Sequence, residues 1–203
     1  MSTYLLIKYA HLIAFVYWLG GDLGTFLASR QVINRDLSPE SRAVALKIML
    51  ACDMGPKLAM PLILPLGMHL AYLTGVLPVS SALLTATWLV GAYWFSVVLV
   101  LFLNEGKPFT AKLSQADLYF RIVVVALLLG YCGWALGQEG SAGWAIAKVA
   151  LFAAMVCCGI AIRINLKTFV PAFGAMMTSG ASETTDTAMA ASIARCRPWV
   201  RPM

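Results

Sequence analysis

The chain contains only two histidines, His11 and His69, and both lie inside long apolar runs. If the first run crosses a membrane inward from about Tyr4 and the second crosses outward to about Leu77, the two imidazoles lie at a similar depth, roughly 10–12 Å below one surface at 1.5 Å per residue. Cofactor sites in helical bundles are built from side chains on facing helices. This shared depth predicts that His11 and His69 are metal ligands, either axial ligands of a haem iron or ligands of copper. The alternative is a structural pair that makes hydrogen bonds between helices.

Two lysines and a tryptophan fall near the histidines. Lys8 lies one helical turn before His11, Lys148 lies near the outer end of a later apolar run, and Trp18 shares the helical face of His11. A lysine at this depth predicts a partner for a carboxylate such as a haem propionate. The alternative is that the ammonium group of the lysine extends outward to the membrane surface, which requires no ligand.

Proline and glycine mark the second apolar run before His69. Pro65 has no N–H to donate, so the helix is expected to bend there. Gly67 has no side chain, which predicts room for a flat macrocycle against the helix, although a simple packing kink explains it equally well. Met68 and His69 are adjacent and do not face the same way on a regular helix. A copper site would therefore depend on His11 and His69 with other nearby methionines.

The elements that carry these residues are predicted from composition. The chain is 61% hydrophobic and 12% charged, whereas soluble domains are about 25% charged. This excludes a soluble enzyme domain, a nucleic-acid-binding protein and a disulfide scaffold, despite the net charge of +6. Long apolar runs predict an all-α, polytopic membrane bundle of five transmembrane helices. The predicted spans are Tyr4–Ala28, Leu58–Leu77, Leu83–Leu103, Tyr119–Gly137 and Gly143–Ile164.

Shorter segments complete the predicted organisation. Residues 1–164 are expected to form the transmembrane domain, and residues 165–203 a cytoplasmic tail with a helix over about 182–195. Residues 38–52 begin with Ser38-Pro39, a helix-start signal, and mix basic with apolar positions. They predict a short cytoplasmic helix on the membrane surface. In the first span, Gly20, Gly24 and Ala28 recur every four residues and predict close helix packing.

The basic residues predict the orientation of the spans. Thirteen of the 15 lysines and arginines, all but Lys8 and Lys148, lie in three places: between spans one and two, at the start of span four or in the link before it, or at and beyond the end of span five. Because basic residues concentrate on the cytoplasmic side of a membrane, the N-terminus is predicted outside and the C-terminus in the cytoplasm. The predicted location is the bacterial inner membrane.

Two short segments carry a family resemblance. The segment His11-Leu-Ile-Ala-Phe-Val-Tyr-Trp18-Leu-Gly-Gly resembles the first helix of the HemJ-type membrane protoporphyrinogen oxidases, and Trp144-Ala-Ile-Ala-Lys148-Val-Ala-Leu resembles their W-x-x-x-K-x-x-L helix. The resemblance implies a helical protein that binds haem b, with His11 in haem binding and a functional role for Lys148. The fifth span, with Arg163 and Pro171 after its K-x-x-L-F, is also similar to the copper-resistance D (CopD) family, a relative of the first.

The chain departs from the oxidase pattern at two points. The arginine that follows the family's first-helix W-x-G is replaced by a stretch containing Asp22, and His69 matches no residue of the motif. These departures favour a haem b membrane protein that transfers electrons with quinone or a periplasmic redox protein. The alternatives are a protoporphyrinogen oxidase-like enzyme, a copper-handling membrane protein and a subunit without a cofactor. The lipid bilayer is the expected surrounding, and homo-oligomers are left open.

Overall fold

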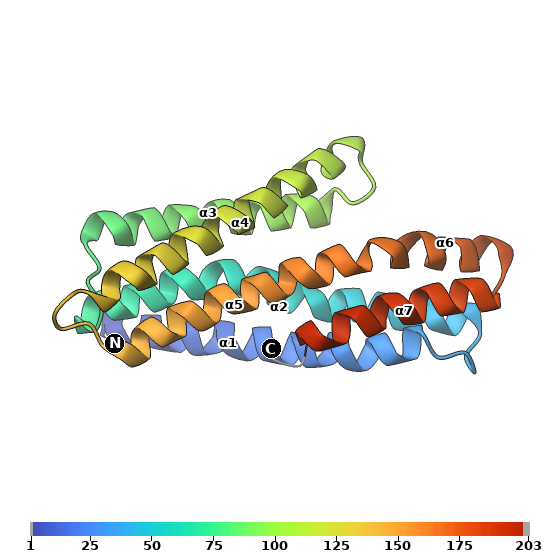
Figure 1. Ribbon diagram of the computed structural model, residues 1–203, viewed down its shortest axis with the longest axis horizontal. Helices are drawn as coiled ribbons and strands as arrows, with labels where there is room; N and C mark the ends of the chain where they lie inside the picture. The colour runs from blue at the N-terminus through green and yellow to red at the C-terminus, as the bar shows by residue number, and fades with distance from the viewer. Residues whose placement is uncertain (1, 201–203) are drawn as a thin grey trace. The chain divides into compact units, whose positions relative to one another are not determined.

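Seven α-helices make up the structure of the described chain, residues 2–200 of the computed structural model (Figure 1). They are α1 (Thr3–Val32), α2 (Pro39–Thr74), α3 (Ser81–Leu103), α4 (Pro108–Leu136), α5 (Gly143–Asn165), α6 (Phe169–Ser179) and α7 (Glu183–Val200), with a 3-10 turn η1 (Leu166–Thr168) between α5 and α6. Five helical stretches are long and apolar enough to cross a membrane, the fifth running from Gly143 to Ser179. The predicted all-α fold with five membrane-spanning helices is confirmed.

Local signals explain several helix ends. Gly75 follows α2 with φ +68°, a left-handed conformation that favours glycine after a helix. The side chain of Ser80 accepts a hydrogen bond from the Leu83 N–H at 3.2 Å and caps α3. Pro108 lies in the first turn of α4, where its missing N–H costs no helical hydrogen bond.

The helices run further than the apolar runs that predicted them. The separate helix over 38–52 is wrong, because those residues form the first turns of a single 36-residue helix, α2. Ser38 and Pro39 do mark the helix start, but the change from polar to apolar sequence does not end a helix. Helix α4 likewise begins at Pro108, before the predicted span. The helix predicted over about 182–195 is confirmed as α7, whereas α6 was not predicted.

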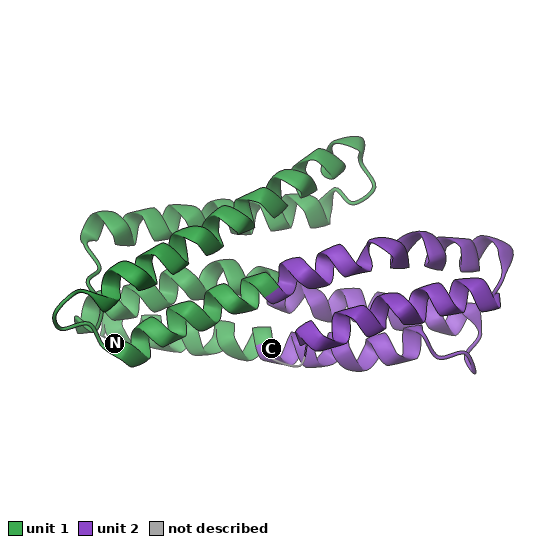
Figure 2. Ribbon diagram, viewed as in Figure 1, with its two compact units in different colours: residues 1–18, 57–157 green, residues 19–56, 158–203 purple. Residues whose placement is uncertain are grey.

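The helices group into two compact units (Figure 2). Unit 1 contains the chain up to Trp18 together with Lys57–Cys157, and unit 2 contains Leu19–Pro56 together with the chain from Cys158 onward. The segment after 165 carries buried apolar residues that pack with the ends of α1 and α2, so it is part of a folded unit.

In unit 1, α2 and α3 approach closely at a glycine. A Cβ on Gly91 would lie 2.7 Å from the carbonyl oxygen of Pro61 and 2.8 Å from Cγ of Pro65, so only glycine fits without a shift. Trp94, one turn later on α3, is fully buried and packs edge-on against Phe120 of α4 at 5.8 Å. These contacts join three helices of unit 1 through α3.

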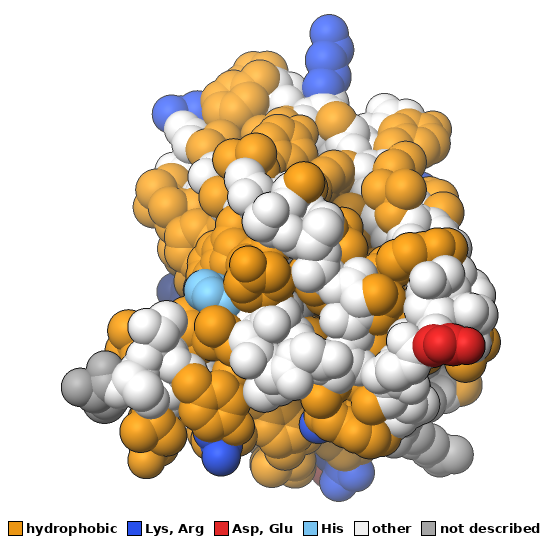
Figure 3. All heavy atoms as spheres, turned by 90° about the vertical axis from the view of Figure 1, so that its left-hand side faces the viewer, with side chains coloured by type: hydrophobic (Ala, Val, Ile, Leu, Met, Phe, Trp, Pro, Cys, Tyr) orange, Lys and Arg blue, Asp and Glu red, His pale blue; other side chains and the backbone are white. Residues whose placement is uncertain are grey.

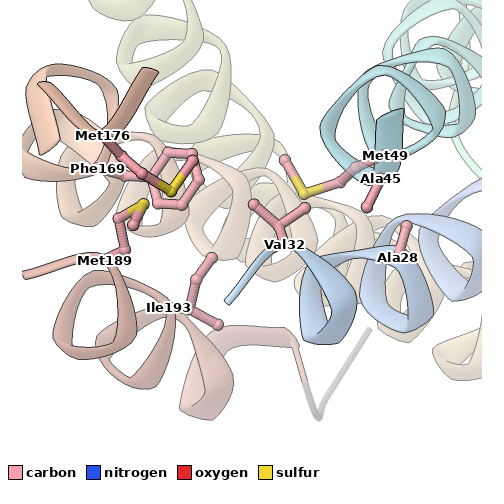
Figure 4. Close-up of a cluster of buried hydrophobic side chains, with 8 residues drawn as sticks. All are labelled: Ala28, Val32, Ala45, Met49, Phe169, Met176, Met189 and Ile193. Carbon is pink, nitrogen blue, oxygen red and sulfur yellow. The ribbon is translucent and has the colours of Figure 1, made fainter. Parts of the chain in front are cut away.

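Unit 2 has its own apolar core, drawn in Figure 4. Helices α1, α2, α6 and α7 each contribute two buried side chains: Ala28, Val32, Ala45, Met49, Phe169, Met176, Met189 and Ile193. Beside this core, Arg42 is 1% exposed, pairs with Asp186 at 2.7 Å and donates from Nε to the carbonyl of Val32 at 2.8 Å. The ion pair joins α2 to α7, residues far apart in sequence.

The small residues of α1 pack against α2 within unit 2, with one correction. A Cβ on Gly24 would lie 2.8 Å from Sγ of Cys52, as close packing requires, and Ala28 is buried in the core. Gly20 has no neighbouring atom within 4 Å, whereas a Cβ on Gly21 would overlap Pro56. The predicted contact at Gly20 is wrong, because α2 lies on the side of α1 that carries Gly21.

Candidate functional site

Within unit 1, α1 places His11 against bare backbone of α2. A Cβ built on Gly67 would lie 3.2 Å from Cε1 and 3.8 Å from Nδ1 of His11. The ring therefore occupies the space that the missing side chain of Gly67 leaves. The ring also interacts electrostatically with the backbone of Ile63, one helical turn before Gly67. The glycine predicted to make room on α2 thus makes room for an imidazole.

The His11 side of α1 also meets α5. Trp18, two turns after His11, is 3% exposed and packs edge-on against Phe152 at 5.9 Å. Lys148 lies one turn before Phe152 on α5 and interacts electrostatically with His11. Its Nζ stands 4.8 Å from the ring centroid of Trp144, and the residue is exposed. Helices α1, α2 and α5 thus bring four predicted residues to one part of unit 1: His11, Trp18, Gly67 and Lys148.

His69 faces a different neighbour. Its ring lies edge-on to Trp88 of α3, with 6.1 Å between ring centroids. Residues 67 and 69 are separated by about 200° around a helix, so the face of α2 that carries His69 is turned away from the face against which His11 packs. Similar depth in two helices does not by itself bring their side chains to the same face.

Lys8 lies outside this group of contacts. It is exposed, and its Nζ stands 5.8 Å from the ring centroid of Tyr4 on the same helix.

Figure 3 shows one face of the molecule, on which a histidine side chain reaches the surface among hydrophobic side chains.

Three of the predicted side chains carry buried polar atoms that lack a partner. Within residues 2–200, Nδ1 of His11, Nδ1 of His69 and Nε1 of Trp18 are buried and make no hydrogen bond. Buried polar atoms in folded proteins are almost always paired. Nδ1 of His11 is a ring nitrogen whose lone pair could bind a metal ion. These atoms fit a ligand that supplies their missing interactions.

The donor set distinguishes between kinds of metal site. The described chain contains no group of three or more His, Cys, Asp or Glu side chains that could hold a metal ion. A zinc ion bound by protein alone needs about three or four such donors. Haem iron takes its equatorial nitrogens from the macrocycle and needs only one axial imidazole. The residues around His11 therefore fit the axial position of a haem better than a zinc site made by protein alone.

Sequence reasoning missed a polar site on α4. Asp117 is buried and its Oδ2 accepts a hydrogen bond from Nε of Arg121 at 2.9 Å, while the Arg121 guanidinium stands 5.1 Å from the ring of Trp94. The predicted fourth span begins at Tyr119 and so excludes Asp117, although the four-residue spacing of Asp117 to Arg121 is typical of a helical ion pair.

Comparison of the chain with protein-family models, curated proteins and solved structures gives no match. The assignment of function therefore depends on the residues themselves.

Proposed function

We propose that this chain is an integral membrane haem b protein that takes part in electron transfer, with His11 as the protein ligand of the iron. The observation that carries the proposal is the buried Nδ1 of His11, which has no partner and lies against the bare backbone of Gly67. A ligating histidine usually donates its second ring N–H to a carbonyl or carboxylate, and the backbone carbonyl of Ile63 would be that group here.

The neighbouring residues have defined roles in this proposal. Lys148 would neutralise a propionate, Trp18 would donate its indole N–H to the bound group, and Lys8 would add positive charge at the exposed end of the same helix. Haem supplies a one-electron iron couple whose potential depends on the ligands and charges around it. A quinone or a periplasmic redox protein would exchange the electron, and the bacterial inner membrane is the proposed location.

The test is the visible spectrum of the full chain, purified in detergent from haem-sufficient cells, with a pyridine-haemochrome assay for haem b. We expect a Soret band and haem b. His11→Ala should lose the haem, while Lys148→Ala should lower its occupancy without changing the spin state. Lys112→Ala, which removes an exposed lysine from α4, is the matched control and should change neither. A wild-type protein without haem would overturn the proposal and favour copper handling or a subunit without a cofactor.

His69→Ala decides whether the iron has a second protein ligand. If His69 binds the same iron, the wild-type spectrum is low-spin and the variant becomes high-spin. Since His69 lies on the other face of α2, the structure favours a single histidine ligand and an unchanged spectrum in the variant.

A single histidine ligand also favours a second candidate function. An iron with an open axial position suits an enzyme better than a pure electron carrier, which supports a protoporphyrinogen oxidase-like activity. The test is the appearance of porphyrin fluorescence when the haem-loaded protein is supplied with protoporphyrinogen and quinone. No porphyrin above the haem-free His11→Ala background would exclude this activity.

A further inference from the structure

A cavity in unit 2 is lined by two arginines. Its volume is about 440 Å³, and its walls are Phe26, Arg30 and Ile33 of α1 and Arg197 of α7. The two arginines come from the last turns of their helices. No acidic residue lines the cavity, so its wall carries two positive charges and two apolar side chains.

The guanidinium groups of these arginines are available to a ligand. Among residues 2–200, no hydrogen bond or ion pair engages the side chain of Arg30 or Arg197, whereas Arg42 and Arg121 both pair with carboxylates. The Arg30 guanidinium lies 4.6 Å from the ring centroid of Phe26, a cation–π contact that holds it at the cavity wall. Each guanidinium therefore keeps its full set of donors for an anion.

The chemistry of the wall selects a phosphate group. The planar fork of arginine matches the oxygens of a phosphate and binds two of them at once. A cavity of this size lies within the range of about 300–1,000 Å³ that holds small ligands. The apolar side chains of Phe26 and Ile33 suit a phosphate attached to a less polar group rather than a free ion.

The length of α1 relates the cavity to the membrane surface. A helix of 30 residues is about 45 Å long, whereas the hydrocarbon core of a bilayer is about 30 Å thick. If the span begins near the start of α1, Phe26 and Arg30 lie beyond the hydrocarbon core, at the level of the lipid headgroups. Basic pockets at this level bind anionic lipids.

We propose that Arg30 and Arg197 bind the phosphate of an anionic membrane lipid. The site is separate from the proposed haem site in unit 1 and does not depend on it.

The test compares three ligands on the full chain in detergent micelles: phosphatidylglycerol, phosphatidylcholine and inorganic phosphate. Native mass spectrometry counts bound lipid, and a titration followed by thermal unfolding gives the affinity. We expect phosphatidylglycerol to bind and raise the unfolding temperature, with much weaker binding of phosphatidylcholine, whose choline cation offsets the phosphate. Binding of inorganic phosphate as tight as that of phosphatidylglycerol would overturn the lipid assignment in favour of a soluble phosphate compound.

Arginine variants test the site itself. Arg30→Gln and Arg197→Gln should each weaken phosphatidylglycerol binding about fivefold. This is the affinity change expected when one arginine near an anionic lipid surface loses its positive charge. Arg35→Gln is the matched control, because Arg35 is exposed, lies just beyond α1 and makes only a 3.3 Å hydrogen bond to Thr187. The control should bind like the wild type. An equal loss in Arg35→Gln, or no preference for the anionic lipid in the wild type, would overturn the proposal.

Discussion

Individual side chains in this protein owe their roles to the one or two groups beside them. His11 is an example: its ring lies where a side chain on Gly67 would be, and its buried Nδ1 has no hydrogen-bond partner, the two features on which its proposed role depends. Cys196 is a contrasting case, a buried thiol that donates to the carbonyl of Ile162 at 3.7 Å. Burial raises the pKa of the Cys196 thiol, and the neighbouring positive charge of Arg195 opposes this only in part.

The raised pKa of Cys196 predicts slow alkylation of the folded protein. A thiol with a raised pKa is less ionised at a given pH, and only the thiolate reacts. In a variant whose other four cysteines are alanine, maleimide labelling at pH 8 should be slower in the folded protein than in denaturant. The stabilisation from keeping this thiol neutral is present below the unfolded pKa, about 8.5, and is lost as pH rises through the higher folded value. Equal labelling rates in both states would contradict this prediction.

Helices of this protein contact each other in two ways, at glycines that have no side chain and at a buried ion pair. Gly91 allows α3 to contact the Pro61 carbonyl on α2, while Gly133 on α4 has no atom within 4 Å of a built Cβ. In unit 2, the contact between α2 and α7 includes the buried pair of Arg42 and Asp186. The two kinds of contact respond differently to substitution.

Gly91→Ala should lower stability because its Cβ would overlap backbone, which does not move aside as a flexible side chain does. Overpacking of this kind costs about 1–3 kcal/mol. Gly133→Ala is the matched control in open space, and it should raise the free energy of unfolding by about 0.5–1 kcal/mol, since alanine favours helix over glycine. Thermal unfolding of both variants in the same detergent measures the difference. A neutral Gly91→Ala would show that α2 and α3 are further apart than described.

Asp186→Ala should destabilise unit 2 strongly. It leaves the guanidinium of Arg42, which is 1% exposed, without its carboxylate, and an uncompensated buried charge costs about 3–5 kcal/mol. Replacing both partners, as in Arg42→Met with Asp186→Leu, should recover most of the loss because no charge remains buried. Asp36→Ala, at an exposed acid, is the control and should change stability by less than about 0.5 kcal/mol. If Asp186→Ala were as stable as Asp36→Ala, the ion pair of Arg42 and Asp186 would contribute nothing to stability.

At the scale of the whole molecule, five helices are long and apolar enough to cross a membrane, and successive crossings would place successive connections on opposite sides. The connection around Gly140 carries no basic residue, whereas the connection around Gly106 includes Lys107 and leads to Lys112. This asymmetry favours a cytoplasmic position for the second connection.

Reporter fusions test this orientation. An alkaline phosphatase fusion after Ser80 or Gly140 should be active, as expected in the periplasm, and a fusion after Gly106 or at the C-terminus should be inactive. A fluorescent reporter that folds only in the cytoplasm is the reciprocal control at the same sites. A periplasmic C-terminus would contradict the predicted orientation.

The sequence by itself determined the helices and the residues that share one helical face. Apolar runs, the capping Ser80 and the seven-residue spacing of His11 and Trp18 act through local geometry, which is the same in any α-helix. The prediction of a separate helix at 38–52 failed because α2 continues through Gly55 and Pro56, two residue types that disfavour a helix interior.

Only the tertiary structure decided which faces meet. His69 points toward Trp88, Gly21 rather than Gly20 contacts α2, and Arg42 pairs with Asp186 from the far end of the chain. A rotation of one residue turns a helix by about 100°, so the choice of partner depends on the packing of all neighbouring helices at once. No local pattern of residue types specifies that rotation.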